Sequence, residues 1–190
     1  QISLWKEKFE KFILHKEKFV LKPSNWKCWT WVKIFQKSEI WADFYDKNIK
    51  NNESLVLQER IENYPLHINS TKKDWNLRVL VTFDALKNKY ISVWMIWRIG
   101  NYWEVINISQ NAEYISFEDL SKLIWLDKLQ SKKLKKNLYN ISTKSVNAIS
   151  KRFADNKTNF QTISWVDIIL DKNLIPFVIE VNPATSGWMY

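Results

Sequence analysis

Residues 166–183 read VDIILDKNLIPFVIEVNP, and this stretch decides how the chain folds. Its surroundings contain two apolar runs, residues 163–170 and 175–181, which are rich in β-branched side chains and separated by a short polar segment. Such runs are typical of β-strands, and a polar break of a few residues between them indicates a hairpin turn. The sequence therefore predicts an antiparallel hairpin whose turn centres near Asn173.

Three polar side chains interrupt this apolar hairpin. Side chains alternate across a strand, so Glu180 and Asn182 share one face, and a turn near Asn173 places Asp167 almost opposite Glu180. Opposed like charges destabilise a strand pair, and a divalent cation between them would remove the conflict. Ligation by a few oxygen atoms favours Mg²⁺, whose other positions go to phosphate and water. The alternative interpretation is that the acids only decorate an edge hairpin.

The rest of the chain predicts strands and helices joined mainly by hairpin-type connections, which is typical of the α+β class. The expected strands are residues 19–21, 32–35, 55–61, 77–83, 90–99 and 105–108. The expected helices are residues 3–17, 117–129 and 144–153, the last two separated by a lysine cluster.

The composition indicates a globular protein with a basic surface. The 190 residues are 46% hydrophobic and 26% charged, with a net charge of +9. The lysines are scattered apart from Lys132, Lys133, Lys135 and Lys136, which we interpret as a solvated helix face rather than a nucleic-acid site. An excess of Lys, Asn and Ile also fits translation from an AT-rich genome. The basic charge would steer anionic ligands towards the protein.

Several features are those expected of a cytoplasmic protein. The single cysteine, Cys28, excludes an intrachain disulfide and fits a reducing compartment. The sequence has no run of about 18 uncharged apolar residues that could span a membrane, and no secretory signal follows Gln1.

Tryptophan and glycine occur in unusual numbers. The chain has 12 Trp and 2 Gly, whereas average usage predicts roughly 13 Gly in a chain of this length. Several tryptophans occupy turn-like positions, notably Trp26, Trp29 and Trp31 within residues 24–32, SNWKCWTWV. We therefore predict that most of these codons are UGA, which some bacterial codes read as glycine. The alternative is an aromatic-rich surface on which bases or sugars stack.

The hairpin at the end of the chain resembles the terminal Mg²⁺ motif of the ATP-grasp superfamily. The resemblance rests on Asp167, on Glu180 thirteen residues later, on Asn182, and on Pro183 with the small-residue run 185–187. D-alanine–D-alanine ligases and glutamate-adding ligases carry this motif.

Further segments extend the resemblance, in the family's order, over most of residues 19–109. Residues 19–23 (FVLKP) resemble the strand that bears an ATP lysine, and residues 24–32 resemble the glycine-rich phosphate loop once their tryptophans are read as glycine. Residues 57–61 (LQERI) are similar to the strand and hinge that hold adenine. Residues 76–81, 98–100 and 107–109 are similar to the central part of glutamate-adding ligases, and residues 110–160 match only as helices.

This resemblance implies an α+β ATP-grasp fold, in which two subdomains hold the nucleotide in the cleft between them. Residues 1–60 would form the small subdomain with the ATP lysine and the phosphate loop. Residues 61–190 would form the large subdomain with the phosphate and Mg²⁺ site. The family's amino-terminal domain and first ATP lysine would lie before Gln1, so we expect the chain to be a fragment.

The resemblance also implies roles for individual residues. Arg98 would stabilise a transferred phosphoryl group with support from Arg78 and Asn107, although Arg78 could instead form a simple inter-strand ion pair. Mg²⁺ ions that bridge the β- and γ-phosphates would be held by Asp167, Glu180 and Asn182. The ATP-binding residues would be Lys22, Ser24, Trp26, Trp29, Trp31, Glu59, Ile61 and Glu62.

The implied activity is that of an ATP-dependent carboxylate–amine ligase. A small-molecule or peptide carboxylate would attack the γ-phosphate of Mg²⁺-bound ATP, and an amine would then displace phosphate from the acyl phosphate. Neither a membrane nor a nucleic acid is an expected partner. Literal tryptophans at 26, 29 and 31 would oppose ATP binding, and residues 110–112 depart from the small, glycine-rich pair of the family. Two alternatives stay open: a nucleotide-binding module without chemistry, and a nucleic-acid or glycan binder if the tryptophans are genuine.

Overall fold

The computed structural model describes residues 2–23, 32–40, 55–101, 113–155 and 162–183. It divides into two compact units, Gln1–Ile61 and Glu62–Tyr190. Each unit combines helix with an antiparallel sheet, so the predicted α+β class is confirmed.

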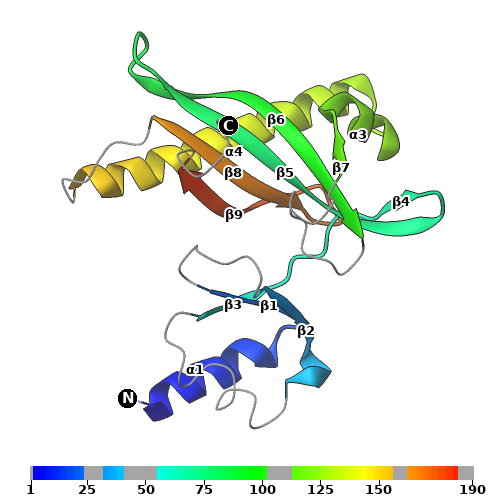
Figure 1. The fold of residues 1–190 in the computed structure, drawn as a ribbon, viewed down its shortest axis with the longest axis vertical. Coiled ribbons are helices and arrows are strands. Elements are labelled where there is room, and N and C mark those ends of the chain that lie inside the picture. Colours follow the sequence, from blue (N-terminus) through cyan, green and yellow to red (C-terminus); the bar gives the residue numbers. More distant parts are fainter. Residues whose placement is uncertain (1, 24–31, 41–54, 102–112, 156–161, 184–190) are drawn as a thin grey trace. The chain divides into compact units, whose positions relative to one another are not determined.

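The described residues of the first unit form a three-stranded sheet with the helix α1 (Figure 1). Strand β1 lies between β2 and β3, and Phe12 of the helix contacts Phe19 of β1 at a ring-centroid distance of 5.8 Å. Phe19 and Leu21 are buried, and because side chains alternate, Lys22 lies on the other face of this sheet. The elements are α1 (Ile2–Leu14), β1 (Lys18–Pro23), β2 (Lys33–Gln36), the 3₁₀ helix η2 (Lys37–Glu39) and β3 (Leu55–Glu59).

The second unit is a six-stranded antiparallel sheet in the order β7-β6-β5-β8-β9, with the short β4 paired to β5. Figure 1 shows α4 lying across these strands, and it contacts β5, β6, β8 and β9. The strands are β4 (Leu66–Ile68), β5 (Thr71–Asp84), β6 (Lys89–Asn101), β7 (Glu113–Ile115), β8 (Ile163–Leu170) and β9 (Pro176–Pro183). The helices are α3 (Phe117–Leu123) and α4 (Lys128–Asp155).

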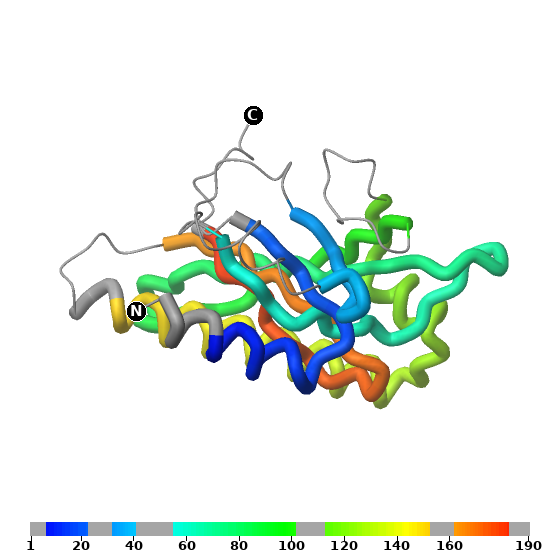
Figure 2. Tube along the Cα trace, turned by 90° about the horizontal axis from the view of Figure 1, so that it is seen from below, coloured from blue at the N-terminus to red at the C-terminus, as the bar shows by residue number. Residues whose placement is uncertain are grey.

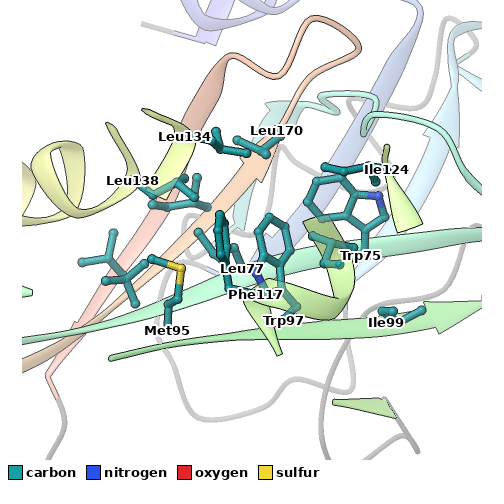
Figure 3. Close-up of a cluster of buried hydrophobic side chains, with 14 of the residues drawn as sticks. Trp75, Leu77, Met95, Trp97, Ile99, Phe117, Ile124, Leu134, Leu138 and Leu170 are labelled. Carbon is teal, nitrogen blue, oxygen red and sulfur yellow. The ribbon is translucent and has the colours of Figure 1, made fainter. Parts of the chain in front are cut away.

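One face of the large sheet packs against both helices and forms the hydrophobic core (Figure 3). Alternate residues of β5, namely Leu77, Val79 and Val81, are fully buried, as the two-residue period of a strand requires. Two indoles, Trp75 and Trp97, are also fully buried, with ring centroids 4.7 Å apart. Fully burying one large apolar side chain contributes roughly 1.5–3 kcal/mol, so this face supplies most of the packing energy of the unit.

The strand predicted at residues 105–108 lies outside the described residues. The other predicted strands are found, although the one predicted at 77–83 begins earlier, at Thr71. The predicted division of the helices is wrong. The lysine cluster was expected to separate two helices, whereas it lies inside α4, and the break occurs earlier, between Leu123 and Lys128. Lysine is a good helix former, and Leu134 and Leu138 among these lysines are buried against the sheet. The apolar positions therefore continue one helical face through the cluster.

Two tight turns fix the strand registers. Asn69 and Ser70 join β4 to β5 with φ of 50° and 63°, the pair of positive values that a type I′ turn requires. Figures 1 and 2 both show this hairpin projecting beyond the rest of the sheet. Between β8 and β9, Asp171 accepts hydrogen bonds from the backbone N–H groups of Asn173 and Ile175, both at 2.8 Å. The turn predicted near Asn173 is confirmed.

A tryptophan occupies the position where a helix usually ends with glycine. Trp125 has φ of 59°, and its N–H donates to Lys122 O at 3.1 Å, while Leu126 N–H donates to Ser121 O at 2.9 Å. These two bonds form a Schellman motif with Trp125 at the left-handed residue, which is normally glycine. The indole is 90% exposed, so no packing offsets the backbone strain. This position favours glycine, whereas the genetic-code hypothesis for the whole chain stays a prediction.

We expect Trp125→Gly to raise the free energy of unfolding by roughly 0.5–1 kcal/mol, because glycine adopts positive φ without a Cβ clash. Ala148→Gly is the matched control: it creates the same residue at an exposed position inside α4. That change should destabilise by roughly 1 kcal/mol. Urea unfolding of both variants beside the parent measures the two effects, and a loss of stability in Trp125→Gly would contradict this account of the turn.

Candidate functional site

The face of the large sheet that lies opposite the core carries a cluster of charged side chains. We call it the site face. Strand register aligns its residues in rows across the sheet, and each row has one residue per strand. The first row contains Glu180 of β9, Asp167 of β8, Arg78 of β5 and Ile96 of β6. The pairing of Asp167 with Glu180 is the one that the sequence predicts.

Arg78 and Asp167 form a bidentate ion pair. Arg78 Nε donates to Asp167 Oδ1 and Arg78 Nη2 donates to Asp167 Oδ2, both at 2.7 Å. The side chains of Arg78 and Asp167 are 13% and 5% exposed, so the pair is largely shielded from water. Bidentate geometry and burial make this interaction much stronger than a surface ion pair. The inter-strand ion pair considered for Arg78 is therefore present.

The neighbouring row contains Asn76 of β5, Arg98 of β6 and Tyr114 of β7. Arg98 Nε donates to Asn76 Oδ1 at 2.8 Å, and Arg98 Nη2 lies 3.2 Å from Asp167 Oδ1. Arg98 is only 2% exposed. Asp167 thus joins the two rows, because it is the carboxylate that both guanidinium groups contact.

The two arginines differ in how well their charge is compensated. Burial acts most strongly on the pKa of Arg78, but the hydrogen bond and charge of Asp167, with help from Glu180, outweigh burial and raise that pKa. Burial lowers the pKa of Arg98, and the charge of Arg78 lowers it further against the attraction of Asp167. Burial also raises the pKa of Tyr114, whose phenol is already neutral at pH 7. Arg98 is therefore the less compensated cation.

A third row places aromatic rings beside the charged rows. It contains Trp94, Leu80, Trp165 and Asn182. The rings of Trp94 and Trp165 meet edge to face at 5.9 Å, and the guanidinium of Arg78 lies 5.9 Å from the Trp165 ring centroid. Asn182 is 7% exposed. The acid Glu180 and the amide Asn182 of β9 therefore lie on the same face, in successive rows.

A β-bulge in β9 changes which residues of this strand face the core. Asp167 pairs with Glu180, whereas Ile168 pairs with Val178, so Ile179 is an extra residue. Val178 and Val181 both pack against the core although they are three residues apart, a spacing that strict alternation would place on opposite faces. The bulge keeps the core contacts of β9 while it directs Glu180 to the site face.

The expected like-charge conflict between Asp167 and Glu180 is relieved by arginine. The sequence argument held that a divalent cation between the two carboxylates would remove the conflict, and the structure shows a second means, because Arg78 and Arg98 already compensate Asp167. Charge repulsion by itself therefore does not indicate a metal.

The donor set nevertheless fits Mg²⁺. Two carboxylates and one amide oxygen are hard ligands. Asp167 has about four acceptor positions, and its contacts with described residues occupy three of them, so Oδ2 keeps one. Within the described ranges no group of three or more His, Cys, Asp or Glu side chains could hold a metal. A metal here would depend on Glu180, Asn182 and Asp167, with the remaining positions filled by phosphate or water.

The predicted nucleotide residues are only partly described. Lys22 is half-buried on β1, and the carboxylate of Glu59 pairs with Lys16 at 2.6 Å. Ile61 ends the first unit and Glu62 begins the second. The remaining candidates, Ser24, Trp26, Trp29, Trp31 and Asn107, lie outside the described residues. No observation tests the roles of these residues, and they stay predictions.

Sequence reasoning missed Asn76 and Tyr114 as site residues. The available signal was alternation: Asn76 and Arg78 are two residues apart on a strand, so they share a face. Tyr114 lies on a three-residue strand that a period of two cannot reveal, and only the register with Arg98 brings it to the site.

Some of the tryptophans bear on the alternative of an aromatic surface for bases or sugars. Trp75 and Trp97 are buried in the core and cannot stack on a base or a sugar, whereas Trp94 is 49% exposed. A pocket of about 340 Å³ lies at the edge of β6 and is lined by side chains from β6, β7, α3 and α4, but it does not include Asp167.

Of the helices in the described ranges, none combines the length and apolar character that crossing a bilayer requires.

Two solved structures share this architecture. The C-terminal domain of Pby1 from K. lactis, an ATP-grasp enzyme that interacts with the mRNA decapping enzyme Dcp2, superposes with a TM-score of 0.54 at 17% identity, over 96% of this chain and 53% of that one. D-cycloserine synthetase DcsG gives a TM-score of 0.54 at 14% identity, over 93% of this chain and 51% of that one. The chain thus spans about half the length of each. No protein-family model and no curated protein sequence matches it.

These likenesses show the fold. The α+β architecture with its antiparallel sheets is that of ATP-grasp proteins, as the resemblance implied. At such low identity they establish no activity and no substrate.

We expect Asp167→Asn to lower the free energy of unfolding by roughly 3–5 kcal/mol, because it leaves two buried guanidinium groups without their shared carboxylate. Glu118→Gln is the control: it removes a carboxylate that pairs with Lys135 at 3.2 Å but is 66% exposed, so its loss should change stability little. Urea unfolding followed by circular dichroism compares the two. Equal effects would show that burial of the Asp167 cluster is unimportant.

Proposed function

We propose that this chain is the catalytic part of an ATP-dependent carboxylate–amine ligase that uses Mg²⁺-bound ATP. The observation that supports this most is the joint placement of Asp167, Glu180, Asn182 and the two arginines on one face of an ATP-grasp sheet. Carboxylates that can hold Mg²⁺ beside arginines that can hold phosphoryl oxygens are what phosphoryl transfer to a carboxylate needs.

Each group would have a defined task. Arg98 would contact the oxygens of the transferred phosphoryl group, and Arg78 would hold Asp167 in place through the bidentate pair. Glu180, Asn182 and one oxygen of Asp167 would hold Mg²⁺, which when bound neutralises charge on the β- and γ-phosphates. Lys22 would contact phosphate oxygens as a point charge.

The remainder of the proposal follows from the resemblance. Ser24 with positions 26, 29 and 31 would form the phosphate loop, Glu59 with Ile61 would hold adenine, and Glu62 would bind the ribose. Asn107 would assist Arg98. The carboxylate substrate is a small molecule or a peptide, and the acceptor is an amine.

We expect Glu180→Gln to abolish most Mg²⁺-dependent phosphate release from ATP, with a loss of about a hundredfold or more, because a metal ligand contributes several kcal/mol to the transition state. The melting temperature without ligand should fall only slightly, through loss of a charge that acts on Arg78. The rise in melting temperature that Mg²⁺ and ATP cause in the parent should disappear.

Glu113→Gln provides the matched control for this experiment. Glu113 is exposed, and it pairs with the buried Ile99, so it lies on the sheet face opposite Glu180. Its variant should behave as the parent in both assays. Equal turnover in Glu180→Gln and the parent would refute the metal assignment, and ATP binding without turnover in the parent would favour a non-catalytic nucleotide-binding module.

A further inference from the structure

Asn76 is the neutral hydrogen-bond partner of Arg98 on the site face. Its side-chain oxygen accepts the Nε–H of Arg98 at 2.8 Å, so it fixes the plane of the guanidinium group. It does so as a neutral amide. An aspartate in the same place could accept the same hydrogen bond but would also cancel the charge of Arg98.

The surroundings of Arg98 make that distinction important. The largest electrostatic influences on Arg98 are Asp167, Arg78 and Tyr114, and of these only Asp167 is an anion. Asp167 is already held by Arg78 through two contacts of 2.7 Å, and its contact with Arg98 is longer, at 3.2 Å. Glu180 lies on the far side of Asp167 from β5, and its charge acts on Arg78. Among the described residues, Asp167 is thus the carboxylate that an ion pair joins to the buried Arg98.

Tyr114 completes the row on the other side of Arg98. It pairs with Arg98 in the sheet, and its phenol is neutral at pH 7 because the ordinary pKa of tyrosine is about 10. Arg98 is therefore flanked along its row by two neutral hydrogen-bonding side chains, Asn76 and Tyr114. A bound oxyanion would supply the missing compensation.

We infer that Asn76 is a positioning residue that orients Arg98 and, by being uncharged, reserves its positive charge for a phosphoryl oxyanion. This inference rests on the proposed function for the identity of the anion as a phosphoryl group. It goes beyond that function because it states that the site binds a phosphoryl oxyanion more tightly when the side chain at position 76 is uncharged.

The test compares Asn76→Asp with Asn76→Ala and Asn101→Asp in the 190-residue chain. Asn101 is an exposed residue of the same strand pair whose side-chain oxygen accepts a hydrogen bond from Lys73 at 2.9 Å, so Asn101→Asp adds the same charge beside a base outside the site. Melting temperature is measured against inorganic phosphate and, at equal ionic strength, against acetate. The release of phosphate from ATP in the presence of Mg²⁺ is measured in parallel.

We expect phosphate to stabilise the parent and Asn101→Asp equally. In Asn76→Asp the melting temperature without phosphate should rise, because Arg98 gains a carboxylate, while the apparent phosphate affinity should fall about tenfold or more. In Asn76→Ala both quantities should fall, because Arg98 loses its orienting partner. A purely structural role for Asn76 predicts that its variants lose stability but keep the phosphate affinity of the parent, and that result would overturn the inference.

Two further outcomes separate this inference from the proposed function. If phosphate does not stabilise the parent, or if acetate stabilises it as well as phosphate does, position 76 does not serve a phosphoryl site and the inference fails, whatever the turnover. If phosphate affinity follows the expected order but the parent releases no phosphate from ATP, the inference stands and the ligase proposal fails.

Discussion

The shared carboxylate of Asp167 is the interaction on which the site face depends. Burying a charge is costly unless it is paired and hydrogen-bonded, and here one carboxylate serves two largely buried guanidinium groups on different strands. The arrangement requires that β6, β5 and β8 keep their register, since a slip of one residue would turn Arg78 or Asp167 towards the apolar core. The core and the ion cluster therefore specify the same strand alignment from opposite faces of the sheet.

Local patterns allowed much of this to be predicted. The β8–β9 hairpin and the opposition of Asp167 and Glu180 follow from alternation and a short turn, both of which act within a few residues. The contact between Arg78 and Asp167 joins positions 89 residues apart, and no local period indicates which strand lies beside β5. For the same reason the sequence offered an inter-strand ion pair for Arg78 but could not identify Asp167 as the partner that it shares with Arg98. The predicted position of the helix break was wrong for a different reason. The lysine cluster looks like a boundary in the sequence, although apolar residues continue one face of α4 through it.

The described tryptophans occupy environments that favour different residues. Trp75 donates its indole N–H to Tyr64 O at 2.9 Å and packs on Trp97, so glycine at position 75 would remove a well-satisfied core side chain. The indole N–H of Trp97 is buried without a hydrogen-bond partner in the described part of the chain, which is costly for a literal tryptophan. Trp125 is exposed and strained where glycine would be relaxed. The packed core is thus a property of the tryptophan-containing chain, and codon identity decides whether the natural chain shares it.

The physical cost of the ion cluster is itself an argument about function. Well-packed apolar residues of similar volume stabilise a protein as well as a buried ion pair does, so stability alone gives no reason to gather Arg78, Arg98, Asp167 and Glu180 on one sheet face. The opposite face of the same strands shows that this sheet can pack apolar side chains. Perturbed ionisable groups that are gathered on one face, with one cation only partly compensated, are typical of sites that bind a charged ligand. The chemistry of the arginines favours an oxyanion as that ligand, as the proposed function requires.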